Sequence, residues 1–251
     1  MSNLDRRSFN RTMLGSLLTF SLLETLHACD AFGAAVKPVA VKWLNEVNQL
    51  GFDLKDQKLK QTEWQTQVEE LFGKVDLPEL LTLIDFDELT RNIRLVDNGA
   101  RSLRFGFQQV EGVPDNLSFG RQIFALKKDR SVVPHGHNNM ATAFLILKGN
   151  FHGQHWDRLE TEAEHYLIKP TIDERFGPGQ HSSISDIKDN VHWFKALDEP
   201  AFIFNIHVMD ISPDTGAPTG RLYLDPHGEK LEGGVIRAKK LNHEQAHKLY
   251  G

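Results

Sequence analysis

The first third of the chain carries apolar side chains at the spacing of α-helices. Val41, Leu44, Val47 and Leu50 recur at intervals of three residues, and Gly51 follows them directly. Such a stripe predicts a helix that buries one face, and the glycine is expected to end it.

Two further stripes follow the first. One contains Trp64, Val68, Leu71 and Phe72, and Gly73 is expected to end it. The other begins at Pro78 and covers residues 80–89. Residues 36–95 are therefore predicted to form a helical N-terminal region whose apolar stripes pack against a core.

From about residue 96 the pattern changes to short β-branched and aromatic runs separated by turn residues. The expected strands span 105–110, 119–126, 141–147, 151–156, 165–168, 192–196 and 201–209. Many short strands at this spacing predict a sandwich or barrel, with jelly rolls among the options. Residues 96–251 are thus expected to form a mainly β domain, either a sandwich or a barrel, with weak helical character over 238–250.

The N-terminus has the pattern of an export signal. Arg6 and Arg7 precede Phe9, and an interrupted apolar run covers residues 13–26, too short for a stable membrane span. The paired arginines resemble a twin-arginine signal, so residues 1–35 are predicted to direct the protein to the periplasm or cell envelope. The alternative is an amphipathic helix with a chance pair of arginines.

Cys29 is the one cysteine of the sequence, which excludes an intrachain disulfide. Residues 26–29 resemble a lipobox, which would make Cys29 a lipid anchor, although His27 departs from the usual small or aliphatic residue. Cleavage near residues 31–34 would instead give a soluble product. The net charge of -5 argues against a nucleic-acid partner, because phosphate contact needs a basic face.

Histidines supply the candidate chemistry. His135 and His137 form a His-Gly-His sequence, and His192 follows in the segment 189–194. Residues two apart on a strand share one face, so both imidazoles of the pair would point the same way. A third imidazole from a neighbouring strand would complete a site of three nitrogens for a divalent metal.

The two histidine segments are similar to the two motifs of the cupin superfamily. His135-Gly136-His137 and the run to Gly149 resemble the first motif, and 178–179 with 190–194 resemble the second. Most metal cupins have a glutamate a few residues after the histidine pair, whereas this chain has Met-Ala-Thr-Ala at 140–143. The resemblance covers roughly 119–223 and implies a cupin-type jelly-roll barrel.

Three histidines without the glutamate resemble one cupin subgroup, the thiol dioxygenases, and most closely the plant cysteine oxidase and cysteamine dioxygenase branch. The resemblance implies Fe(II) held by His135, His137 and His192. It also implies oxidation of a small thiol, such as cysteine or cysteamine, by dioxygen to a sulfinic acid. Three neutral imidazoles fit this chemistry, since a substrate thiolate can supply the negative charge the ligands lack.

Other histidines are candidates for supporting roles. Cysteine dioxygenases carry a Ser-x-His-x-Tyr relay, and the corresponding pattern here is Asn205, His207 and Met209. His207 is therefore a candidate neighbour of the ligands, without the phenol of its relatives. His155 either points into the barrel or lies on the surface. His181 is a rival third ligand, although its place after a Pro-Gly turn favours the rim.

An amino-acid substrate would need a partner for its carboxylate, and the guanidinium fork of arginine matches two oxygens. Arg121, on an expected strand near the first motif, is the main candidate, with Arg101 and Arg104 as alternatives. Two other functions stay open. One is a non-catalytic metal- or ligand-binding cupin of the envelope, and the other is a three-histidine oxygenase acting on a diketone or phenol.

Overall fold

The computed structural model of the chain describes residues 37–212 and 218–251. The predicted export signal, with Arg6, Arg7 and Cys29, lies outside the described residues and stays a prediction. Among the described helices, none has the length and apolar character needed to cross a membrane.

In the described part of the chain, four helices precede the sheets: α2 (Lys37–Lys55), α3 (Gln61–Phe72), α4 (Leu77–Ile84) and α5 (Phe86–Thr90). The predicted end of the first helix at Gly51 is wrong, because α2 continues to Lys55. Gly51 is needed there for close packing, since a β-carbon would clash with the side chain of Ser118. The third predicted stripe is two helices, divided at Asp85, which has a left-handed backbone (φ 56°).

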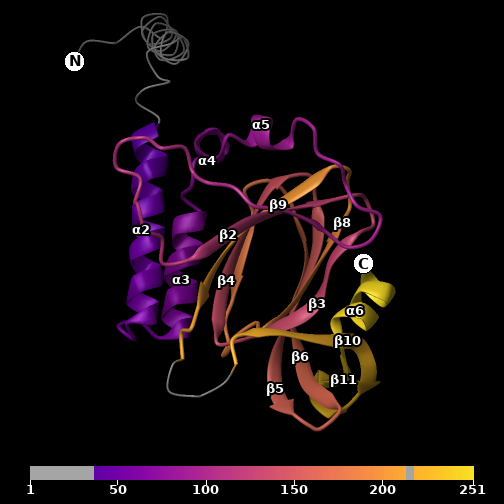
Figure 1. Cartoon of the computed structure of the whole chain (residues 1–251). Coiled ribbons are helices and arrows are strands. Elements are labelled where there is room, and N and C mark those ends of the chain that lie inside the picture. The colour runs from indigo at the N-terminus through magenta and orange to yellow at the C-terminus, as the bar shows by residue number, and fades with distance from the viewer. Residues whose placement is uncertain (1–36, 213–217) are drawn as a thin grey trace, which may run out of the picture.

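The strands form a five-stranded antiparallel sheet and a closed barrel (Figure 1). The sheet has the order β1 (Arg101–Leu103), β2 (Gly120–Leu126), β9 (Ala201–Met209), β4 (Met140–Lys148) and β7 (His181–Ile184). The barrel order is β10 (Gly220–Lys230), β11 (Ile236–Leu241), β6 (His165–Phe176), β5 (Phe151–Thr161), β8 (Val191–Ala196) and β3 (Ser131–Asn138). A short 3-10 turn, η2 (Glu232–Gly234), joins β10 to β11, and α6 (His243–Tyr250) follows β11.

The five-stranded sheet is buried on both faces. In β4, Ala143 and Leu145 belong to the core shared with the helices, whereas Phe144 and Ile146 belong to the core between the sheets. Figure 1 shows α2 and α3 standing against one side of this sheet. Burial on both faces explains why 143–147 is a continuous apolar run instead of an alternating one.

The predicted fold, a mainly β jelly-roll barrel with a helical N-terminal region, is confirmed by this topology. The strand expected over 105–110 is wrong. That segment has no regular secondary structure. The aromatic residues that suggested a strand, Phe105 and Phe107, pack against each other, with their ring centres 5.4 Å apart. The weak helical pattern near the C-terminus is confirmed by α6, although Ala238 lies in β11.

Candidate metal centre

Two barrel strands bring the three predicted histidines together. His135 and His137 lie on β3, and His192 lies on β8 directly opposite His135 in the antiparallel register. All three side chains are buried, with at most 3% of each residue exposed. Gly136 allows β3 to lie close to the residue that precedes β8, because a β-carbon at position 136 would lie 2.7 Å from the side-chain oxygen of Asn190.

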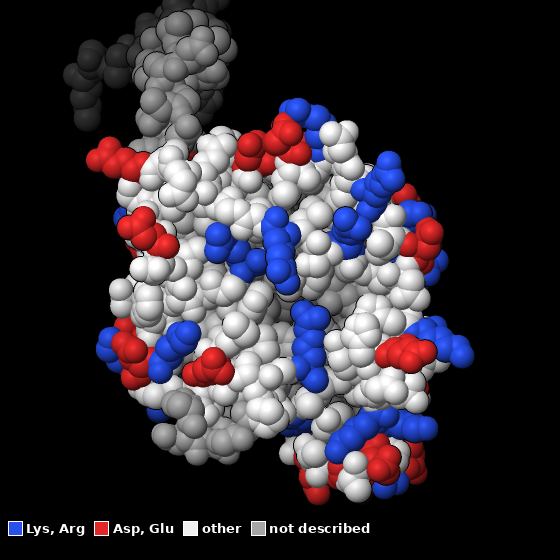
Figure 2. Space-filling model, viewed as in Figure 1, with Lys and Arg blue, Asp and Glu red and all other residues white. Residues whose placement is uncertain are grey.

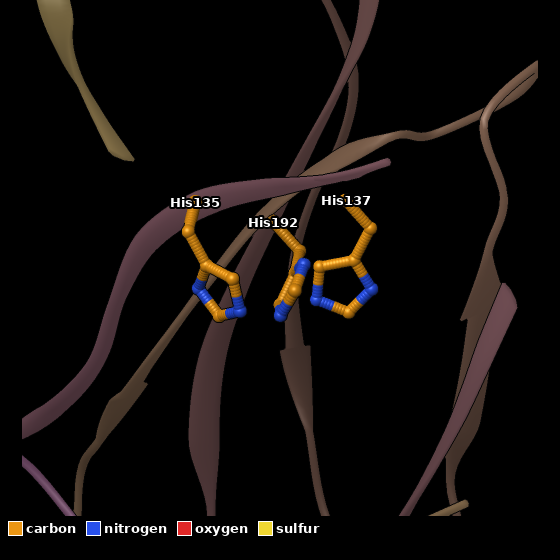
Figure 3. A group of neighbouring side chains, drawn as sticks. All are labelled: His135, His137 and His192. Carbon is orange, nitrogen blue, oxygen red and sulfur yellow. The ribbon is translucent and has the colours of Figure 1, made fainter. Parts of the chain in front are cut away.

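The three rings converge from the two strands, with His192 seen between the other two in Figure 3. The centre of the His135 ring lies 5.0 Å from that of His137 and 4.1 Å from that of His192. Each histidine offers one nitrogen, and these nitrogens lie within 4.8 Å of one another. Small ring rotations would bring them to the roughly 3 Å spacing of nitrogens that share an ion at bonds of about 2.1 Å.

Hydrogen bonds fix the orientation of two rings. Nδ1 of His135 lies 2.8 Å from the carbonyl oxygen of Val133, and Nδ1 of His137 lies 3.1 Å from the hydroxyl oxygen of Thr142. A proton on Nδ1 of His135 donates to that carbonyl and leaves Nε2 with a free lone pair. Nε2 of His137 is buried and has no hydrogen-bond partner among the described residues.

Burial keeps the trio neutral. Desolvation, helped by the charge of Arg221, lowers the pKa of His135 to about 3. Desolvation also lowers the pKa values of His137 and His192 well below the usual range. Neutral imidazoles have lone pairs to give, so the donor set fits a divalent metal.

The trio lines a cavity of about 470 Å³ that opens to solvent. The other lining residues are Arg104, Phe105, Gly120, Arg121, Gln122, Phe124, Met140, Thr142, Phe144, Asn205, His207, Met209 and Arg221. No aspartate or glutamate is among these described lining residues. The glutamate ligand that is missing from the sequence motif therefore has no substitute from elsewhere in the described parts of the chain.

His207 lies near the trio, as the sequence suggested. It lines the cavity, half-buried, and a β-carbon on the facing Gly120 would lie 2.2 Å from its Nε2. Asn205 and Met209 share its face of β9 and also line the cavity. The side-chain oxygen of Asn205 is buried without a partner among the described residues, so this amide is free to contact a ligand.

The two remaining candidate histidines differ in place. His155 is fully buried beside His192, and its Nε2 lies 3.4 Å from the Ser182 hydroxyl, so it points into the barrel. His181 instead packs its ring 6.4 Å from that of Phe72 on α3. It faces the helices and is absent from the cavity lining, which separates it from the trio.

The candidate arginines are distributed unevenly. Arg104 and Arg121 line the cavity, whereas Arg101 is exposed on β1 and does not. Gly120 and Gln122 lie on the cavity-facing side of β2, opposite His207 and Asn205. Arg121 lies between them in the strand, so its side chain leaves β2 on the opposite face, toward the helices. Its guanidinium reaches the cavity from between the rings of Phe105 and Phe107.

Sequence reasoning missed Arg221. This residue lies on β10 directly opposite His137, so the two side chains share the inward face of the barrel. It lines the cavity together with the trio. Nothing in the local sequence indicates this position, because the pairing of β10 with β3 joins distant parts of the chain.

No family model and no curated protein matches the chain. Solved structures are similar to parts of it at low identity. A cupin superfamily protein from Desulfitobacterium hafniense has 14% identity over 47% of this chain and 84% of its own, with a TM-score of 0.32. An oxalate oxidase has 11% identity over 51% of this chain and 56% of its own, with a TM-score of 0.35.

The chain spans about a quarter of other similar structures. It covers 23% of procruciferin, an 11S globulin from Brassica napus, at 13% identity over 43% of this chain with a TM-score of 0.32. It likewise covers 28% of an 11S globulin from Wrightia tinctoria. The case for a metal centre therefore rests on the chain's own residues.

Thr142→Val is expected to weaken metal binding without abolishing it. The hydroxyl of Thr142 holds the ring of His137, and loss of such an outer partner typically costs about 10–100-fold in metal affinity. Competition with a chelator of known affinity measures the change. Unaltered affinity in a folded Thr142→Val protein would mean that this hydrogen bond does not orient the ligand.

Proposed function

We propose that the protein is a non-haem Fe(II) dioxygenase that oxidises a small thiol to a sulfinic acid. The carrying observation is a buried group of three neutral histidines in a cavity with no acidic residue among its described lining. Bound iron would bring thiolate and dioxygen together and favour the deprotonated thiol. The reaction joins both oxygen atoms of one dioxygen to the sulfur, so it needs no external reductant.

Five of the residues that line the cavity have a task in this proposal. His135, His137 and His192 would hold the metal on one side and leave the other side open to the cavity. The phenyl ring of Phe144 packs 4.8 Å from the ring of His192 and closes the apolar wall behind it. His207, which faces the cavity over Gly120, would position a substrate group or hold a proton beside the sulfur.

Oxygen uptake tests this function. The protein is purified without oxygen, loaded with Fe(II), and mixed with cysteine, cysteamine, 3-mercaptopropionate or 2-mercaptosuccinate in an oxygen electrode. We expect consumption of one dioxygen per thiol and a product heavier than the substrate by two oxygen atoms. Iron-loaded protein that consumes no more oxygen than the metal-free protein, with every thiol, would contradict the proposal.

A second candidate is a non-catalytic metal- or ligand-binding protein. The observation that favours it is the residue pair beside His207, since Asn205 and Met209 supply no phenol. Metal analysis distinguishes this candidate from the dioxygenase, because bound zinc or nickel without turnover would support binding alone.

Iron-dependent oxygen uptake only with a diketone or phenol would instead indicate an oxygenase for non-thiol substrates.

A further inference from the structure

The rim of the main cavity is strongly basic. Arg104, Arg121 and Arg221 all line it, and no acidic residue is found among its described lining residues. In Figure 2, lysine and arginine side chains gather around the hollow near the middle of the face shown, while most acidic ones lie toward its edges. A cavity with one sign of charge attracts ligands of the opposite sign.

Arg221 acts most directly on the metal centre. It stands opposite His137 across the β3–β10 pair, at an exposed position, and lines the cavity together with the trio. It also lines an adjoining cavity of about 220 Å³ that shares His135 with the main one. No carboxylate of the described residues forms an ion pair with it.

Arg121 has a buried donor nitrogen without a hydrogen-bond acceptor, which is independent evidence for an anionic ligand. The carbon of its guanidinium lies 5.8 and 5.3 Å from the ring centres of Phe105 and Phe107, which hold it by cation–π contact. Its Nε is buried without a hydrogen-bond acceptor, and no described carboxylate pairs with the group. A buried unpaired donor is costly, so a bound ligand that supplies oxygen atoms would relieve this cost.

The charges can then be compared with those of candidate thiols. A divalent ion bound by three neutral imidazoles would keep its charge of +2, and the three guanidinium groups of the lining add further positive charge. A thiolate neutralises only one unit of this total positive charge, and an aminothiol such as cysteamine brings another positive charge. We propose that the substrate is a thiol with two acidic groups, bound by Arg221 and Arg121. This inference deepens the proposed function and rests on it.

Kinetics with matched thiols test the substrate class. The probes are 2-mercaptosuccinate, with two carboxylates, 3-mercaptopropionate, with one, and cysteamine, with none. Because a hydrogen bond to a charged group contributes more than a neutral one, we expect kcat/KM to fall about 10–100-fold with each carboxylate removed. We also expect this preference to shrink at high salt, since exposed charges are screened over about 8 Å at physiological ionic strength.

Substitutions test the residues. Arg221→Gln is expected to lower kcat/KM for 2-mercaptosuccinate about 10–100-fold and to reduce the ratio of this kcat/KM to that for cysteamine by at least as much. Arg221→Lys keeps the charge and should restore part of the loss, but not the paired contact of the guanidinium fork. Arg175→Gln, at an exposed position of β6, is the matched control and should match the unaltered protein.

A binding measurement separates this inference from the proposed function. Calorimetry with metal-free protein compares succinate with propionate, neither of which can be oxidised at sulfur. Arg221-dependent binding of succinate without oxidation of any thiol would support the anion site and overturn the dioxygenase. Thiol oxidation with equal kcat/KM for all three thiols would leave the dioxygenase standing and overturn the substrate class. Failure of both would overturn both.

Discussion

Replacing His192 with alanine is expected to abolish stable iron binding. His192 is the only member of the trio on β8, so the variant keeps two candidate ligands, both on β3. Two imidazoles alone would hold an iron ion much more weakly than three. The loss should exceed the about 10–100-fold expected for an outer partner such as Thr142. Metal content after anaerobic loading and desalting measures it.

His181→Ala is the matched control, since it removes an imidazole that packs against Phe72 and away from the cavity. It should retain iron like the unaltered protein. Near-ultraviolet circular dichroism shows whether each variant keeps its packed barrel. A folded His192→Ala protein that still holds one iron per chain would show that the third ligand is another residue.

Trp64→Ala is expected to cost about 3–5 kcal/mol of unfolding free energy, the usual cost of removing a large buried aromatic side chain. Trp64 lies on α3, has no exposed surface and belongs to the core shared by the helices and the five-stranded sheet. Neighbouring polar contacts also join α3 to the sheet, since Glu69 accepts hydrogen bonds from the backbone and hydroxyl of Ser183. Urea denaturation followed by fluorescence and circular dichroism measures the change.

Val39→Ala serves as its control. Val39 lies on α2 with 54% of its surface exposed, so its truncation should change stability by no more than about 0.5 kcal/mol. If Trp64→Ala destabilises the protein by less than about 1 kcal/mol, the helices do not hold the sheet in place. A loss of metal binding without loss of stability would contradict a purely structural role for this side chain.

The shared face of His135 and His137 could be predicted from local pattern, because residues two apart point the same way on any strand. The choice of His192 as the third member came from its resemblance to the second cupin motif, and the run 192–196 indicated only that it lies on a strand. His207 was singled out by its resemblance to a relay motif, and its place on the same face of β9 as Asn205 follows from alternation along the strand. Only the alternation depends on neighbouring residues alone.

Arg221 could not be found in that way. It faces the trio because β10 closes the barrel against β3, a pairing between distant segments that leaves no mark in either segment. Arg121 was chosen for its nearness to the first motif, and the register of β2 gives the inward positions to its neighbours Gly120 and Gln122 instead. A shift of one residue along a strand exchanges its faces, which local sequence cannot fix.

Tertiary packing also overrode local signals elsewhere. Gly51 is a helix breaker by propensity, yet α2 runs through it because Ser118 occupies the space of a side chain. The aromatic run at 105–110 has the composition of a strand, yet its rings hold Arg121 at the cavity and form no ladder. The two wrong predictions therefore concern residues whose structure is set by tertiary contacts, one in the helix packed against the sheet and the other at the cavity rim.

X-ray absorption spectroscopy of the anaerobically iron-loaded protein tests the metal centre most directly. We expect one iron per chain with three imidazole nitrogens at about 2.1 Å, together with a new iron–sulfur distance when a thiol is added. His135→Ala, His137→Ala and His192→Ala should each remove the histidine signal. An iron environment of oxygen atoms only, or one unchanged in these three variants, would contradict it.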